Sequence, residues 1–176
     1  MRLDKKVFLK KLSNLGKWFE TCTLYPQNHL NLIEHFELGK VTNKMDVLDV
    51  GCGGEKTYGY TKGLKYKTYT GLDPLFKGPG IVPGIAEDMP FDNNDFDLII
   101  MISVLQHCQD PDKALQECVR VLKPGGKIYA TVYCSTVNDL IAQEFTHESA
   151  KRIFSKYFNV LECVWHNSVA YVKGSV

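Results

Sequence analysis

Four short apolar runs follow one another through the middle of the chain and decide its fold class. They predict strands over residues 45–50, 68–72, 98–103 and 127–133. Runs that are apolar at successive positions are typical of central strands in a parallel sheet covered by helices on both faces. A fifth short strand or a loop is predicted over residues 80–85, where prolines favour an edge position.

Helical and turn signals complete the pattern. Asp110 and Pro111 make a cap and first-turn pair that opens an amphipathic helix reaching Pro124, and Thr146 caps a second helix whose apolar face extends to Phe158. Two closing strands, 160–165 and 168–173, are separated by two residues and must form an antiparallel hairpin. We therefore predict an α/β fold, a Rossmann-like, doubly wound, mostly parallel sheet with a C-terminal antiparallel hairpin.

The length of 176 residues, with 44% hydrophobic residues, predicts one domain. We divide it into an N-terminal helical extension or cap over residues 1–40 and a core over residues 41–176. A formal net charge of +1 gives no overall field that favours nucleic acid, and no apolar run is long enough to span a membrane. The basic first residues suit an amphipathic helix better than a secretory signal, with a transit peptide as the alternative. We expect a cytoplasmic protein.

Six cysteines are scattered along the chain without a CxxC pair. Their spacing supports neither a zinc knuckle nor a redox motif, so no metal site is predicted. We expect them to be small, reduced, mostly buried side chains.

The stretch VLDVGCGGE, Val47 to Glu55, is a strand that runs into a glycine turn. Such a turn lies where open parallel sheets bind ligands, and Gly51 and Gly53 let the backbone turn tightly and approach a ligand. A dinucleotide fingerprint would need glycine or alanine at position 56, where the chain has Lys56. The segment that follows also lacks the apolar stripe of a phosphate-binding helix. S-adenosylmethionine has no phosphate to hold and is the second ligand class.

Four ordered blocks carry a resemblance: VLDVGCGG, TGLDP, IAEDMPFDNNDFDLIIMISVLQH and DPDKALQECVRVLKPGGKIYATVY. They resemble the class I S-adenosylmethionine-dependent methyltransferases, particularly the small type 11 branch, over roughly residues 47–133. The last two blocks are more specific than the glycine loop. The implied cofactor is S-adenosyl-L-methionine, with S-adenosyl-L-homocysteine as the product.

The resemblance implies a set of cofactor-binding residues. Asp49 would lie beneath the methionine moiety and Asp73 would accept hydrogen bonds from the ribose hydroxyls, although each carboxylate also suits the tying of a turn. The other implied cofactor contacts are Gly51, Cys52, Gly53, Pro74, Ala86, Glu87 and Ser103. Ala86 and Glu87 would offer backbone groups to the adenine edge.

Two positions depart from the family pattern. Ile85 stands where the family usually has an acid that contacts the adenine amine, and Glu55 stands at the position of the third glycine. Glu55 suits either a solvent-facing place at a helix start or an acceptor for the cofactor's ammonium group.

Ser103 and His107 follow the strand that faces the reacting methyl group in the family, so they are the candidate catalytic residues. His107 suits either a general base or an orienting residue. The expected function is methyl transfer to a small-molecule or glycan-like acceptor, free or carrier-linked. The alternative is a catalytically weak methyltransferase-like binding or activating subunit, and a nicotinamide oxidoreductase comes third. A homodimer or a complex with a partner subunit is compatible with the sequence.

Overall fold

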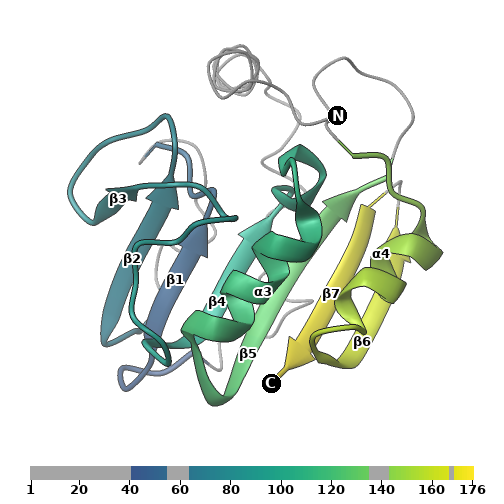
Figure 1. The fold of residues 1–176 in the computed structure, drawn as a ribbon. Helices are drawn as coiled ribbons and strands as arrows, with labels where there is room; N and C mark the ends of the chain where they lie inside the picture. Colours follow the sequence, from purple (N-terminus) through teal and green to yellow (C-terminus); the bar gives the residue numbers. More distant parts are fainter. Residues whose placement is uncertain (1–40, 55–63, 135–142, 167–168) are drawn as a thin grey trace.

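The computed structural model describes residues 41–54, 64–134, 143–166 and 169–176. They form a seven-stranded sheet in the order β3-β2-β1-β4-β5-β7-β6 (Figure 1). The strands are β1 (Asp46–Val50), β2 (Thr68–Asp73), β3 (Ile81–Pro83), β4 (Phe96–Ile102), β5 (Leu122–Tyr133), β6 (Asn159–His166) and β7 (Val169–Ser175). The predicted N-terminal extension and Glu55 lie outside the described residues.

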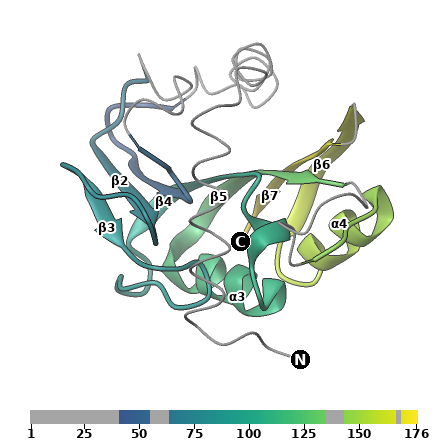
Figure 2. The ribbon, with the colours of Figure 1, turned by 90° about the horizontal axis from the view of Figure 1, so that it is seen from above.

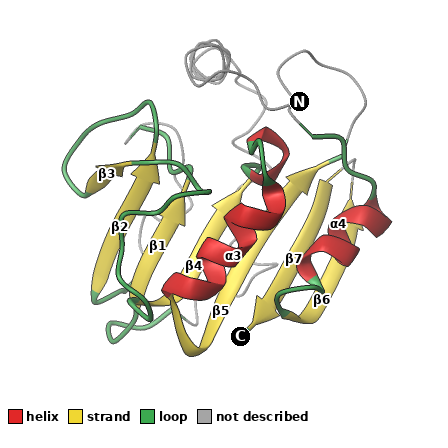
Figure 3. Ribbon diagram, in the orientation of Figure 1, coloured by secondary structure: helices red, strands yellow, loops and turns green. Residues whose placement is uncertain are grey.

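The strand directions confirm the predicted fold class. β3, β2, β1, β4 and β5 pair in parallel, and β7 pairs antiparallel with both β5 and β6. In Figure 3 the arrow of β7 accordingly points opposite to that of its neighbour β5. The sheet is Rossmann-like and mostly parallel, and it ends in the predicted hairpin.

Both α-helices of the described residues cover one face of the sheet. α3 (Pro111–Val121) lies over β4 and β5, and α4 (His147–Phe154) lies near the hairpin (Figures 1 and 2). The Asp110 side chain accepts a hydrogen bond from Lys113 N at 3.1 Å, with Pro111 in the first turn. Thr146 and Ser149 form a reciprocal capping box. The predicted helix starts are confirmed.

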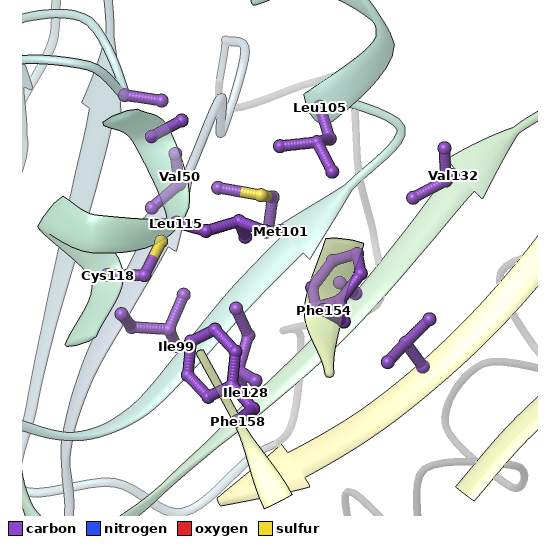
Figure 4. Packing of buried hydrophobic residues seen from close by; sticks show 14 of the residues in the cluster. Val50, Ile99, Met101, Leu105, Leu115, Cys118, Ile128, Val132, Phe154 and Phe158 are labelled. Atoms are coloured by element: carbon purple, nitrogen blue, oxygen red, sulfur yellow. The ribbon is translucent and has the colours of Figure 1, made fainter. Parts of the chain in front are cut away.

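The main core lies between this helical layer and the sheet. Figure 4 shows Leu115 and Cys118 of α3 beside Ile99 and Met101 of β4. Phe154 of α4 is fully buried in the same cluster. A second buried cluster, on side chains that alternate with these along the strands, includes Val47, Leu98, Ile100, Tyr129 and Tyr171. The central strands are therefore buried on both faces, as their continuous apolar sequences predict.

Both helices end earlier than predicted. α3 stops at Val121, and Leu122 already has an extended backbone that begins β5. Lys123 precedes Pro124, whose ring disfavours a helical backbone there. The β4–β5 register shifts at this point, because Phe96 pairs with Leu122 whereas Leu98 pairs with Lys127. The segment up to Gly126 therefore forms an irregularity in the pairing of the two strands.

α4 stops at Phe154, whereas the prediction reached Phe158. Tyr157 N and Phe158 N both donate to Phe154 O, so the chain turns after the helix. Phe158 is still buried in the main core. The helical spacing of Phe158 therefore predicted its burial correctly, although the residue lies in the turn after the helix and not in the helix itself.

The two connections around β3 are short. Residues 74–80 join β2 to the parallel strand β3, and residues 84–95 join β3 to β4. Neither connection contains a helix, although parallel strands are usually joined through one.

The described residues include no helix long and apolar enough to cross a membrane. The expected cytoplasmic location stays a prediction.

Candidate functional site

The strand order reverses between β1 and β4, because the chain leaves β1 for β2 on one side and returns to β4 on the other. Ligands of open α/β sheets bind at such a switch point, at the carboxyl ends of the strands. Gly51 follows β1 there, with a φ of 70°. A Cβ atom on Gly51 would overlap Val104 Cγ2, which follows β4. The glycine therefore allows both the left-handed turn and the close packing of the two strand ends.

Asp73 joins this glycine turn to the end of β2. Its Oδ2 accepts a hydrogen bond from Gly53 N at 3.0 Å, and its Oδ1 accepts from Leu75 N at 2.8 Å and from Phe76 N at 3.1 Å. The residue is 6% exposed, and no ion pair involves it in the described part of the chain. A buried carboxylate with only neutral donors keeps an acceptor position for a further donor. Pro74 directly follows it.

Asp49 is the second buried carboxylate at this edge, at 1% exposed. Tyr69 of β2 donates its Oη hydrogen bond to Asp49 Oδ2 at 2.7 Å. Burial, together with the neighbouring Asp49 carboxylate, raises the pKa of the Tyr69 hydroxyl far above its ordinary value. Tyr69 therefore stays protonated and holds the Asp49 side chain in place.

Cys52 lies inside the glycine turn and packs against β2. A Cβ atom on Gly71 would approach its Sγ to 2.5 Å. Burial, followed by the charges of Asp49 and Asp73, raises the pKa of the Cys52 thiol to about 12. The side chain therefore acts as a packing group in this turn, and its thiol is a poor nucleophile. The five described cysteines are all free, and four are buried.

The loop after β3 contains a four-residue turn with Ala86 and Glu87 at its centre. Asp88 N donates to Ile85 O at 3.2 Å and closes the turn. The Glu87 side chain points away to the loop before α3, where its Oε1 accepts from Gln109 N at 2.8 Å. Both central residues are buried. The carboxylate of Glu87 thus holds the turn against the loop before α3. The contact of the Ala86 and Glu87 backbone with the adenine edge stays a prediction.

Arg120 of α3 fixes the remainder of this loop. Its guanidinium donates to Phe91 O at 2.7 Å and to Met89 O at 2.9 Å, and it pairs with Glu117 at 2.7 Å. Glu117 Oε2 in turn accepts from Met89 N at 2.8 Å. Hydrogen bonding from Arg120 lowers the pKa of the Glu117 carboxyl, so the pair stays ionised. Arg120 and Glu117, one turn apart in α3, therefore hold this loop in place, although the connection from β3 to β4 has no helix of its own.

Ser103, at the end of β4, has a left-handed backbone with a φ of 54°. Ser103 N donates to both the carbonyl oxygen and the Oγ1 of Thr131 at 3.0 Å, and the two hydroxyls lie 3.3 Å apart. A non-glycine residue in this region is strained and needs support from its surroundings. The bend ends β4 one residue earlier than predicted and turns the chain towards His107 in η3 (Leu105–His107).

The structure thus brings the sequence-predicted residues together in two connected groups. Asp49, the Gly51–Gly53 turn and Asp73 form one, and Ser103 and His107 are linked through Gln106 in the other. The roles of Tyr69 and Thr131 were missed, since their contacts depend on the strand register. The role of Gln106 was also missed, since its contacts to Ser103 and His107 depend on how the chain bends after β4. Within the described ranges no three His, Cys, Asp or Glu side chains are grouped as metal ligands would be.

Comparison with known proteins agrees with this geometry. The family model described as a methyltransferase domain matches residues 48–130. Residues 48–130 are therefore similar to this family of methyltransferase domains. The matched span runs from β1 into β5, so it includes the carboxyl ends of β1, β2, β3 and β4.

Two curated relatives are similar over about half of the chain. The phthiotriol/phenolphthiotriol dimycocerosates methyltransferase of Mycobacterium leprae is 36% identical over 115 residues, covering 57% of this chain and 42% of its own length. A ubiquinone biosynthesis O-methyltransferase of Pseudomonas putida is 33% identical over 110 residues, covering 52% and 44%. The chain therefore spans less than half the length of these methyltransferases.

A solved structure extends the fold comparison to nearly the whole chain. The 1,6-didemethyltoxoflavin-N1-methyltransferase of Burkholderia thailandensis, solved with that substrate and S-adenosylhomocysteine bound, superposes with a TM-score of 0.72. The match covers 99% of this chain and 93% of that one at 13% identity. The methyltransferase fold is therefore shared at a low level of sequence similarity.

Proposed function

We propose that the protein is an S-adenosylmethionine-dependent methyltransferase that acts on a small-molecule acceptor. The observation that carries the proposal is the buried Asp73 carboxylate at the switch point, tied to the glycine turn through Gly53 N at 3.0 Å. Asp73 accepts three backbone hydrogen bonds there and no cation pairs with it in the described residues. The match of residues 48–130 to the methyltransferase domain family supports the same function.

The donor set of the cofactor fits these residues. Its ribose hydroxyls are hydrogen-bond donors and its ammonium group is a cation that also donates. The site offers two buried carboxylates, Asp49 and Asp73, as acceptors for such groups. Asp73 would hold the ribose, and Asp49 would lie beneath the methionine moiety with Tyr69 fixing its orientation. The turn at Ala86 and Glu87 would border the adenine. Gly51 lets the turn pack closely against Val104 after β4, and Cys52 packs the turn against β2.

When bound, the cofactor supplies an electrophilic methyl group on a sulfonium, so no covalent nucleophile is needed from the protein. The residues of this chain would align the acceptor for in-line attack and exclude water. Ser103 and His107, at the end of β4, are the residues we place nearest to the acceptor. The two curated relatives are named for a phenolphthiotriol-type substrate and for ubiquinone biosynthesis. We therefore favour a hydroxylated, apolar small molecule, free or carrier-linked.

Calorimetry with S-adenosylhomocysteine tests the cofactor assignment. We expect Asp73→Asn to weaken binding by about tenfold or more, since a charged hydrogen bond contributes about 1.5–3 kcal/mol. The matched control is Asp97→Asn, which changes a carboxylate at the opposite end of the sheet, where Asp97 binds Lys123. Wild-type protein that binds no S-adenosylhomocysteine would refute the proposal.

A cofactor analogue separates the ribose contact from the turn. Wild-type protein should bind 2′-deoxy-S-adenosylhomocysteine more weakly than the parent compound, and Asp73→Asn should lose that preference. An equal preference in both proteins would leave Asp73 as a turn residue only. Transfer of a labelled methyl group to a panel of phenols, quinols and amines then distinguishes an enzyme from the alternative, a binding or activating subunit.

A further inference from the structure

Gln106 lies in η3 between the two residues that we place nearest to the acceptor, and it is 2% exposed. Its side-chain nitrogen donates to Ser103 O at 2.9 Å and lies 3.3 Å from His107 Nε2. Its side-chain oxygen accepts from Tyr133 N at 3.4 Å. The backbone carbonyl oxygen of Gln106 accepts from Gln143 N at 3.0 Å. One buried amide therefore joins the ends of β4 and β5 to the imidazole.

The backbone partners fix which end of this amide is nitrogen. Tyr133 N–H only donates and the Ser103 carbonyl only accepts, so the oxygen must face Tyr133 and the nitrogen must face Ser103. The reversed amide would put oxygen against oxygen and nitrogen against nitrogen. The group that faces His107 is therefore an NH₂, which has hydrogens to donate and no acceptor to offer.

This orientation decides which role Nε2 of His107 takes at its contact with Gln106. An Nε2 atom that faces an NH₂ donor must accept, so it carries no proton, and the neutral ring then has its proton on Nδ1. A positively charged imidazole donates from both nitrogens and would direct an N–H against the amide hydrogens. The strained bend at Ser103, held by Thr131, keeps the carbonyl that orients the amide in place.

We propose that Gln106 is a positioning residue, which holds His107 as the neutral Nδ1–H tautomer with its ring fixed at the acceptor end of the site. His107 then orients the acceptor, because the Nε2 lone pair that a general base would use is engaged by Gln106. A proton lost by the acceptor would then leave to bulk solvent after methyl transfer, without passing through His107 Nε2. The part of this inference that concerns the acceptor rests on the proposed function, and the tautomer itself does not.

The test is the side-chain NMR of His107 in the full chain, with ¹⁵N-labelled histidine and without cofactor or acceptor. The His107 signals are identified among the five histidines by their loss in His107→Asn. At neutral pH we expect a protonated Nδ1 and an unprotonated Nε2. In Gln106→Glu the carboxylate accepts and no longer donates, so the proton should move to Nε2 or the ring should become charged.

The control is Gln116→Glu, the same substitution on the exposed face of α3, which should leave the His107 signals unchanged. A wild-type spectrum with the proton on Nε2 would overturn the proposal. So would a folded Gln106→Glu variant with the wild-type pattern. If that variant does not fold, the wild-type spectrum alone decides. Binding of S-adenosylhomocysteine is measured separately, so failure of the proposed function and failure of this inference are distinguishable.

Discussion

Replacing Gly51 by alanine should destabilise the protein through two separate effects. The backbone φ of 70° costs an alanine about 1–2 kcal/mol, as the left-handed region does for any residue with a Cβ atom. The new methyl group would also overlap Val104 Cγ2, and overpacking of this kind costs about 1–3 kcal/mol. The sum, about 2–5 kcal/mol, is a large part of the stability of an ordinary domain.

Gly125 provides a matched control for the first effect. Its φ is 77°, close to that of Gly51, and a Cβ atom there would meet nothing within 4 Å. Gly125→Ala should therefore cost only the backbone part, about 1–2 kcal/mol. The difference between the two alanine variants measures the overlap with Val104.

Urea denaturation gives the free energies of unfolding. Val104→Ala removes the methyl groups in the way, so the double variant with Gly51→Ala should be about 1–3 kcal/mol more stable than the sum of the two single changes. Costs that add within about 0.5 kcal/mol would show that the two residues are not coupled. A Gly51→Ala variant no less stable than Gly125→Ala would refute the reasoning.

Two further predictions concern the support of the site and its pH dependence. Arg120→Met removes the donors to Met89 O and Phe91 O. We expect this variant to lose about 1–3 kcal/mol of unfolding free energy in urea and to bind S-adenosylhomocysteine more weakly in calorimetry. The control Lys113→Met, at an exposed position of the same helix, should change neither quantity. Hydrogen bonds from Lys123, Thr68 and Lys67 hold the pKa of the Asp46 carboxyl well below its ordinary 3.8. A depressed pKa stabilises the fold above the ordinary value, and this contribution is lost as the pH falls through the folded value. Thermal melts from pH 6 to pH 2 should therefore show a smaller loss of stability in Asp46→Asn than in wild type below about pH 4; parallel curves would contradict this.

The sequence was sufficient for the parts of the fold that local pattern determines. Continuous apolar runs predicted β1, β4 and most of β5, and the two-residue link predicted the antiparallel hairpin. The helix starts followed from Asp110 and Thr146, because a cap is a local hydrogen bond. The helix ends were less accurate, since they depend on whether the following residues pack better as a turn or a strand.

The connections within the site could not be predicted in this way. Tyr69 reaches Asp49 only because β2 pairs with β1 in the observed register, and Thr131 reaches Ser103 only because β5 lies beside β4. Nothing in a serine's immediate sequence indicates a left-handed backbone. Such contacts join residues that are 20 to 28 positions apart, so they become visible only when the strands are assembled.

Asp73 shows why a structural role and a binding role need not compete. Its three backbone hydrogen bonds are those of a residue that ties a turn, which was the alternative to ribose binding. A carboxylate offers about four acceptor positions, so these bonds leave room for a further donor. They also hold Oδ2 at the glycine turn through Gly53 before any ligand arrives. A ligand then loses less free energy to the ordering of the site, since its acceptor is already fixed. The same contacts that make Asp73 a turn residue would thus make it a better ribose acceptor, and only the deoxy analogue separates the two roles.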